Sequence, residues 1–255
     1  MLEVIDLSVK YGDLVIVDKA SFSLEENQWL MIVGPNGAGK STLINAISQG
    51  VPYTGTVLFD GLNLSKIKPV ELAKRMGVLM QNNQVGYSFT VREVVKLGRY
   101  AYSTGVFGTL SDEDEEKINA ALEMTGMSSM MEQPVMTLSG GELQRAFLAQ
   151  LLAQNPRLLI LDEPSNHLDL IYQKQVFELI NEWVKEPGRA VISVVHDLSH
   201  AKAYGTHALL MDHGRQITMG ETNAALTNEA LNRAYNMDVN NWMLSMLSQW
   251  RENSQ

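Results

Sequence analysis

Hydrophobic and polar positions at the start of the chain follow the two-residue period of β-strands. Residues of alternating polarity, or short apolar runs, stand between tight turns such as Tyr11-Gly12-Asp13. Because successive side chains of a strand point to opposite faces, this pattern predicts short strands. The predicted strands cover residues 2–9, 15–17, 22–24 and 29–33.

After Val33 the pattern alternates between helices and strands. Leu43, Ile44 and Ile47 recur at helical spacing behind a glycine-rich loop, so a strand, a loop and a helix follow one another. Further strands are predicted at residues 55–59, 77–80, 158–161 and 190–195. Strands that alternate with helices are typical of a mostly parallel sheet covered by helices, which places the chain in the α/β class.

Residues 90–154 carry helical signals and no strand signals. One helix is predicted at 91–97, and Ser111 before the acidic run 112–116 predicts the N-cap and first turn of a solvated helix. A metal site is a much rarer use of such a run. We expect a single domain over residues 1–255, with a helical subdomain at about 84–155 inserted in the core and a C-terminal tail at about 221–255.

Composition excludes several classes of protein. The chain has 255 residues, 45% of them hydrophobic, and its 20 basic and 29 acidic side chains leave a net charge of −9. This hydrophobicity argues against a disordered chain, and the acidic balance argues against a nucleic-acid partner. Because the chain has no cysteine, no secretory signal and no apolar stretch near ~20 residues, we expect it in the cytoplasm.

Residues 34–42 form the strongest motif of the chain. Their order of Gly, four residues and Gly-Lys-Ser, between a predicted strand and a predicted helix, is that of a phosphate-binding P-loop. Backbone N–H groups converge on the phosphates, Lys40 adds an ammonium group, and Ser41 offers a hydroxyl to Mg²⁺. The sequence therefore predicts ATP and Mg²⁺ as ligands. The predicted binding residues are Gly34, Pro35, Asn36, Gly37, Ala38, Gly39, Lys40, Ser41 and Thr42.

Two acidic residues follow a buried strand. Residues 158–161 are apolar and lead directly into Asp162 and Glu163. The carboxyl ends of parallel strands form the ligand crevice of an open sheet, so both acids are expected near the P-loop. Asp162 is predicted to hold Mg²⁺, and Glu163 to polarise the water that attacks the terminal phosphate.

A second anion site is indicated by Ser139, Gly140 and Gly141. They precede a helical pattern, and a serine hydroxyl with two glycine amides at a helix start offers donors to a phosphate. On its own this would be an ordinary N-cap. Together with a complete P-loop it predicts a composite site shared by two copies, and hence dimerisation across ATP.

These motifs together resemble the nucleotide-binding subunit of ATP-binding-cassette (ABC) transporters, over nearly the whole chain. The resemblance implies a P-loop NTPase core with an N-terminal antiparallel β subdomain and an inserted helical subdomain. Residues 34–42 match the Walker A loop, and residues 139–141 match the signature motif. Residues 158–162 match the Walker B strand, which makes Glu163 the catalytic carboxylate. Glu142 stands where the family usually has Gln, and we expect this to change only local contacts.

The resemblance implies roles for four more residues. Gln81 matches the Q-loop glutamine that joins Mg²⁺ and the attacking water to the helical subdomain. Gln84 is nearby, so the assignment of Gln81 rests on its position directly after the strand at 77–80. Asp169 matches the D-loop acid that communicates across the dimer. His196 matches the switch histidine at the terminal phosphate. Tyr11 aligns with the aromatic residue that stacks on adenine.

The segment 89–100 and the tail resemble importers of ferric siderophores, haem and cobalamin. The resemblance implies a head-to-tail homodimer around two ATP molecules, permease subunits in the membrane, an indirect substrate-binding protein, and a place on the inner face of the cell membrane. Neither segment is expected to touch the nucleotide. Alternatives are an importer for another cargo such as molybdate, a soluble ABC ATPase and, less well matched, a P-loop kinase.

Apolar residues of the segment 241–255 would form a stripe on one face of a helix. Because the other face lacks basic residues, we favour packing against the chain's own body or a sister subunit over a membrane-surface helix.

Overall fold

The computed structural model describes residues 1–80, 88–102, 110–166 and 168–251, without the side chain of Arg251. The chain forms two compact units. The first unit comprises residues 1–2, 24–29 and 58–194, and the second comprises residues 3–23, 30–57 and 195–255. Gln81, the predicted Q-loop residue, lies outside the described residues.

Three parallel strands form the sheet of the first unit. They are β6 (Met76–Leu79), β7 (Leu158–Asp162) and β8 (Ala190–Val194), with β7 in the middle. Val78 lies opposite Ile160, which lies opposite Ile192. All residues of β7 and β8 are buried, which explains why they appear in the sequence as continuous apolar runs. The parallel arrangement predicted for 77–80, 158–161 and 190–195 is therefore confirmed, whereas the strand predicted at 55–59 lies in another sheet and pairs antiparallel with residues 62–63.

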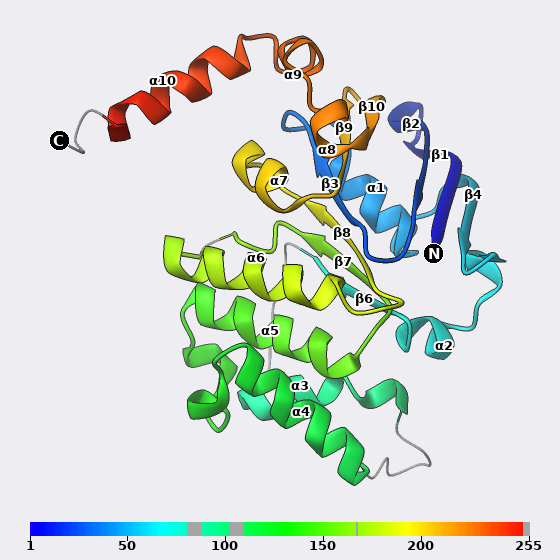
Figure 1. Cartoon of the computed structure of the whole chain (residues 1–255). Helices are drawn as coiled ribbons and strands as arrows, with labels where there is room; N and C mark the ends of the chain where they lie inside the picture. Colours follow the sequence, from blue (N-terminus) through cyan, green and yellow to red (C-terminus); the bar gives the residue numbers. More distant parts are fainter. Residues whose placement is uncertain (81–87, 103–109, 167, 252–255) are drawn as a thin grey trace. The chain divides into compact units, whose positions relative to one another are not determined.

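Helices make up most of the remainder of this unit (Figure 1). The main helices are α2 (Pro69–Ala73), α3 (Val91–Leu97), α4 (Asp112–Met124), α5 (Gly140–Gln154) and α6 (Leu170–Val184). Short 3-10 turns cover Leu64–Lys66, Tyr100–Tyr102, Ser128–Met130 and Val135–Thr137, and β5 (Leu62–Asn63) pairs with the end of β4 (Thr54–Phe59). Within the described part of residues 90–154, the regular elements are helical, as predicted.

A buried aromatic pair holds α6 in this unit. Trp29 stacks on Phe177, with ring centroids 5.6 Å apart. The Trp29 indole N–H donates a hydrogen bond to Ser193 Oγ of β8 at 2.9 Å. The large apolar surface of both rings is thus removed from water, and the one polar atom of the indole is paired.

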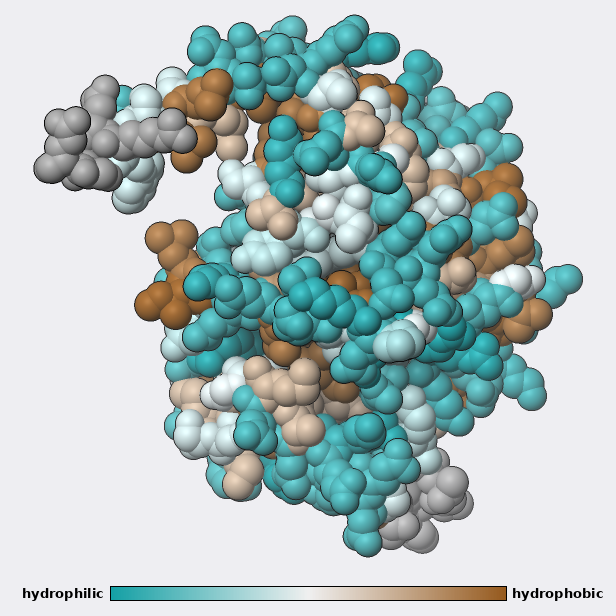
Figure 2. Space-filling view, in the orientation of Figure 1, coloured by the Kyte–Doolittle hydropathy of each residue, from teal (hydrophilic) through white to brown (hydrophobic). Residues whose placement is uncertain are grey.

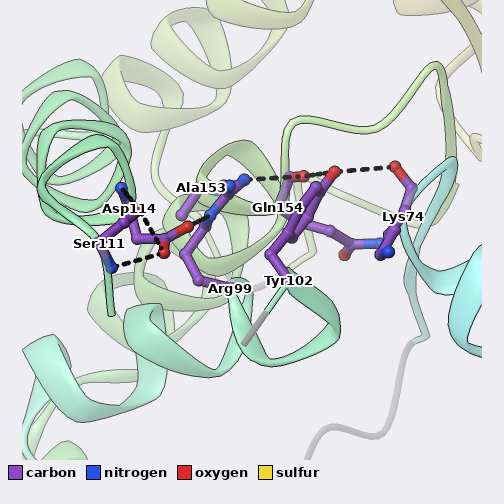
Figure 3. A network of polar contacts seen from close by, with 7 residues as sticks. All are labelled: Lys74, Arg99, Tyr102, Ser111, Asp114, Ala153 and Gln154. Carbon is purple, nitrogen blue, oxygen red and sulfur yellow. Dashed lines mark hydrogen bonds and ion pairs between the residues drawn. The ribbon is translucent and has the colours of Figure 1, made fainter. Parts of the chain in front are cut away.

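The acidic run at 112–116 begins α4, with Ser111 as N-cap, as predicted. The expectation of a wholly solvated run is wrong for Asp114, whose side chain is only 8% exposed and pairs with Arg99 Nε at 2.7 Å (Figure 3). Arg99 also donates to the carbonyl of Ala153 at the end of α5. Buried charges are tolerated when they are paired and hydrogen-bonded, and this pair joins α4 to α5.

The second unit contains two groups of strands. In one group, β1 (Leu2–Tyr11) lies between β2 (Leu14–Leu24) and β4. In the other, β3 (Trp29–Val33) pairs in parallel with β9 (His207–Asp212), which pairs antiparallel with β10 (Arg215–Glu221). The strands predicted at 15–17 and 22–24 are one continuous strand, β2. The hairpin of β9 and β10 was not predicted.

Helices of the second unit begin with α1 (Lys40–Ile47), which follows the phosphate loop. The others are α7 (Leu198–Tyr204), α8 (Thr222–Ala225), α9 (Asn228–Tyr235) and α10 (Val239–Arg251). The predicted tail helix is therefore present as α10. Val239 N–H donates to Asn232 Oδ1 at 2.9 Å, which ties the start of α10 to α9.

Candidate functional site

Two glycines of the phosphate loop are required by their surroundings. Gly34 has φ 147°, and a β-carbon there would lie 2.0 Å from the carbonyl oxygen of Met211. Gly39 has φ 93°, and a β-carbon there would lie 2.6 Å from the carbonyl oxygen of Ile16. Side chains at either position would therefore collide with backbone, and the loop can follow this path only with glycine.

The ammonium group of Lys40 lies inside the loop. The residue is 5% exposed, and Nζ donates to the carbonyl oxygens of Gly34 at 2.8 Å and Pro35 at 2.9 Å. Gly39 is the N-cap of α1 and has no side chain to accept a hydrogen bond from the first turn. The first N–H groups of α1 therefore point their partial positive charge at the loop, which suits a bound phosphate.

Sequence reasoning missed one contact of this loop. Tyr235 at the end of α9 hydrogen-bonds the backbone of Gly34, whereas the sequence motifs assigned the tail no contact with the loop itself. Burial raises the pKa of the Tyr235 hydroxyl, and the bond to Gly34 acts in the opposite direction. Tyr235 lies in the tail segment at about 221–255, to which the resemblance assigned no role at the phosphate loop. No local pattern distinguishes it from other helix-end tyrosines.

His196 belongs to the same unit as the phosphate loop and is exposed. The preceding residue, Val195, donates its N–H to the carbonyl of Ile32 at 3.2 Å. Since Ile32 stands two residues before Gly34, this bond brings the segment of His196 to the strand end that leads into the loop. Tyr11 ends β1 with 53% of its surface exposed, and its stacking on adenine stays a prediction.

In the first unit, β7 ends at Asp162, and Glu163 follows it directly. Asp162 is 2% exposed, whereas Glu163 is half-buried and has φ 54°, a left-handed conformation that is rare for a non-glycine residue. Glu163 N–H donates to the carbonyl of Val194 at 3.1 Å. Strained backbone of this kind is often kept at functional sites.

Asn166 orients the carboxylate of Glu163 and was not singled out from the sequence. Its Nδ2 donates to Glu163 Oε2 at 3.1 Å, and its backbone N–H donates to the Glu163 carbonyl at 3.0 Å. The only sequence feature that could have indicated this contact is the position of Asn166 three residues after Glu163, within one turn. Asparagine at such a position often bonds a nearby group.

The predicted signature motif begins α5. Ser139 is the N-cap, and its hydroxyl donates to Glu142 Oε2 at 2.8 Å, as does its backbone N–H at the same distance. These bonds lower the pKa of the Glu142 carboxyl, against an opposing effect of burial, and the positive charge of Arg145 adds to the lowering. Glu142 therefore closes a capping box around the serine.

Asp169 is exposed and is the N-cap of α6, where it accepts a hydrogen bond from Tyr172 N–H at 3.0 Å. The first unit thus contains Asp162, Glu163, Asp169 and the motif at 139–141. The second unit contains Tyr11, the loop at 34–42 and His196.

The metal ligands predicted in each unit are oxygen donors. The predicted ligands Ser41 and Asp162 supply a hydroxyl and a carboxylate, which suit Mg²⁺, a hard cation that prefers oxygen. Among the described residues, no cluster of three or more histidine or acidic side chains has the geometry of a metal site.

Comparison with known proteins identifies the family. Residues 17–166 match the family model described as ABC transporter. The chain is 40% identical to the uncharacterized ABC transporter ATP-binding protein YvrA of Bacillus subtilis, with 91% of the chain aligned, and spans about half (53%) of that relative's length. It is 36% identical to the iron(3+)-hydroxamate import ATP-binding protein FhuC of the same species, covering 91% of the chain and 87% of the relative. Other relatives are named as ATP-binding proteins for petrobactin import, ferric enterobactin transport and hemin import.

Solved structures agree with the sequence match. A dimeric ATP-binding cassette in a post-hydrolysis state, bound to ADP and phosphate, superimposes with a TM-score of 0.76 at 25% identity and covers 88% of this chain and 99% of its own. The α/β fold with a P-loop is thus confirmed. The chain belongs to the ABC transporter family and is one of its ATP-hydrolysing cassettes.

Proposed function

We propose that this chain is the ATP-hydrolysing subunit that powers an importer, with a ferric siderophore as the favoured cargo and haem or cobalamin as the next. The phosphate loop carries the proposal, because the buried Lys40 and the uncapped start of α1 converge on it. The names of the relatives, most of which refer to siderophores or hemin, support the cargo.

In this proposal each motif has one task. The first N–H groups of α1 and Lys40 bind the phosphates of ATP, and Tyr11 stacks on the adenine. Glu163 accepts a hydrogen bond from the attacking water, while Asn166 holds its carboxylate in place. His196 contacts the terminal phosphate, and Gln81 senses the water. Mg²⁺, held by Ser41, Asp162 and Gln81, supplies charge neutralisation at the phosphates.

A second copy of the chain completes the site. Ser139, Gly140 and Gly141 start α5 with exposed or half-buried donors, and in the proposed head-to-tail dimer they bind ATP on the opposite copy. Leu170 and Ile171 directly follow Asp169 and are 81% and 67% exposed. Figure 2 shows hydrophobic surface at the start of α6, which a second copy would cover. A dimeric relative supports this arrangement.

The permease is the proposed membrane partner. Of the helices that the structure describes, none has the length and apolarity needed to cross a membrane. In this proposal the chain binds the inner face of the cell membrane through permease subunits, and a substrate-binding protein acts further upstream. Isolation of the chain together with a membrane permease would separate this function from that of a soluble cassette.

The oligomeric state of Glu163→Gln tests the shared site directly. We expect a monomer without nucleotide and a dimer with ATP and Mg²⁺, because ATP is bound by both copies but not hydrolysed. Light scattering after size exclusion measures the mass. Lys40→Ala in the same background removes a phosphate ligand and should stay monomeric. A Glu163→Gln chain that binds ATP in equilibrium dialysis and remains a monomer would contradict the shared site.

A further inference from the structure

The signature helix α5 is tied to the segment that follows Glu163 at two neighbouring positions. Gln144 Nε2 donates to the carbonyl of Pro164, the residue after Glu163, at 3.3 Å. The next residue, Arg145, places its guanidinium carbon 4.1 Å from the ring centroid of Tyr172 in α6. Tyr172 in turn donates its N–H to Asp169. A short series of contacts thus runs from the signature helix to the D-loop acid.

Hydrogen bonding alone does not explain the position of Arg145. The residue is 8% exposed, and its Nη1 donates to the carbonyl of Thr125 at the end of α4 at 3.4 Å, a long bond. Its buried Nε has no hydrogen-bond partner within the described part of the chain. An unpaired buried donor is unfavourable, and the attraction to the Glu142 carboxylate and the cation–π contact with Tyr172 both offset this cost.

Arg145 borders an open pocket between α5 and α6. A surface pocket of about 330 Å³, open to solvent, lies beside it and is lined by residues of the end of α4, of α5 and of α6, including Thr125, Leu148 and Val176. Because residues of both α5 and α6 line this open pocket, the two helices are not in close contact along it. Beside this pocket the contact of Arg145 with Tyr172 links α5 to α6, and the bond from Gln144 links α5 to the segment that precedes α6.

We propose that Arg145 is a positioning residue that couples the signature helix α5 to the D-loop helix α6 through its contact with Tyr172. This inference rests on the proposed function. In the proposed dimer, Ser139 serves one ATP while Glu163 and Asp169 serve the other. Arg145 makes these groups move together, so that ATP held at one site orients the residues that act at the second site.

The test measures dimerisation of the full chain in the Glu163→Gln background at saturating ATP. Arg145→Gln and Tyr172→Leu should each raise the dimer Kd at least tenfold, while the Kd of ATP for the monomer changes less than twofold. Tyr172→Phe retains the ring face and should keep the dimer Kd within twofold of the parent. The double variant should be no weaker than either single variant, because both changes remove one contact.

Arg189→Gln is the matched control. Arg189 lies over the ring of Trp183 at 4.6 Å, so the same substitution breaks the same kind of contact near the other end of α6. Thermal unfolding shows how much each variant is destabilised. If Arg145 serves only the stability of the chain, Arg145→Gln and Arg189→Gln should weaken the dimer equally when their Tm values are equal. That result would overturn the proposal.

Two other outcomes are distinguishable. If Tyr172→Leu dimerises as tightly as its parent, or if the double variant shows the sum of both effects, Arg145 does not act through Tyr172. If the Glu163→Gln parent itself binds ATP without dimerising, the proposed shared site fails and this coupling fails with it.

Discussion

The hydroxyl group of Tyr235 connects the end of α9 to the phosphate loop. It bonds the backbone of Gly34, the glycine whose position admits no β-carbon. A loop that presents several backbone N–H groups to one anion binds that anion more tightly when other contacts restrict the motion of the loop. The tyrosine is therefore a support for the loop that comes from the opposite end of the chain.

Tyr235→Phe tests this support with the loss of a single oxygen atom. Removing one hydrogen bond costs about 1 kcal/mol, so we expect ATP to bind about fivefold more weakly. Equilibrium dialysis with labelled ATP measures the Kd. Tyr53→Phe, another partly buried tyrosine of the same unit, should leave the Kd unchanged. Equal Kd values for Tyr235→Phe and the unmodified chain would show that the loop is held without this hydroxyl.

At the scale of elements, α4 and α5 are joined by charged and polar groups as well as by apolar packing. Asp114 of α4 pairs with Arg99, and Arg99 reaches Ala153 at the end of α5 (Figure 3). Tyr102 lies against the guanidinium group of Arg99 at 3.7 Å, and its hydroxyl reaches the carbonyl of Gln154 at 3.0 Å. Such a buried network is sensitive to the loss of any member.

Asp114→Asn should destabilise the chain by about 3–5 kcal/mol, because it leaves the buried Arg99 without a counter-charge. Urea unfolding measures the change in free energy. Glu113→Gln changes an exposed acid in the same helical turn and should cost about 0.5 kcal/mol or less. Similar losses for the two variants would mean that the ion pair contributes no more than the helix dipole.

The same ion pair gives a defined pH dependence. Burial would raise the pKa of Asp114, but hydrogen bonds from Ser111 and the charge of Arg99 outweigh it and lower the pKa from 3.8. A carboxyl with a lowered pKa in the folded state stabilises the fold above its unfolded pKa and loses this effect as the pH falls through the folded value. The stability difference between the parent and Asp114→Asn should therefore be constant from neutral pH to about pH 4 and shrink only below 3.8.

At the scale of the whole molecule, net charge opposes the proposed dimer. Each chain carries −9, so two copies repel one another at long range. Raising the salt concentration from about 20 mM to about 200 mM screens this repulsion, and we expect the ATP-driven dimer of Glu163→Gln to become several-fold tighter. Light scattering over a dilution series measures the dimer Kd. Weaker association in higher salt would instead indicate contacts between complementary charges.

Contiguous motifs were predictable from the sequence alone. The phosphate loop, the acids after β7 and the serine that begins α5 depend on residues within a few positions of one another, so spacing and residue type are sufficient to indicate them. The parallel strands β7 and β8 were predictable because burial on both faces requires continuous apolar runs. The α/β class and the family follow from these local patterns.

Contacts between distant segments were decided only by the tertiary structure. Tyr235 at Gly34, Arg145 on Tyr172 and Asp114 at Arg99 each join residues that no periodicity connects. The hairpin of β9 and β10 was also not predicted from the sequence. Hydrophobic patterns report which face of an element is buried, but they carry no information on which side chain of another element it meets. That choice is made by packing, where the free energy of a polar contact depends on the partner and on its burial.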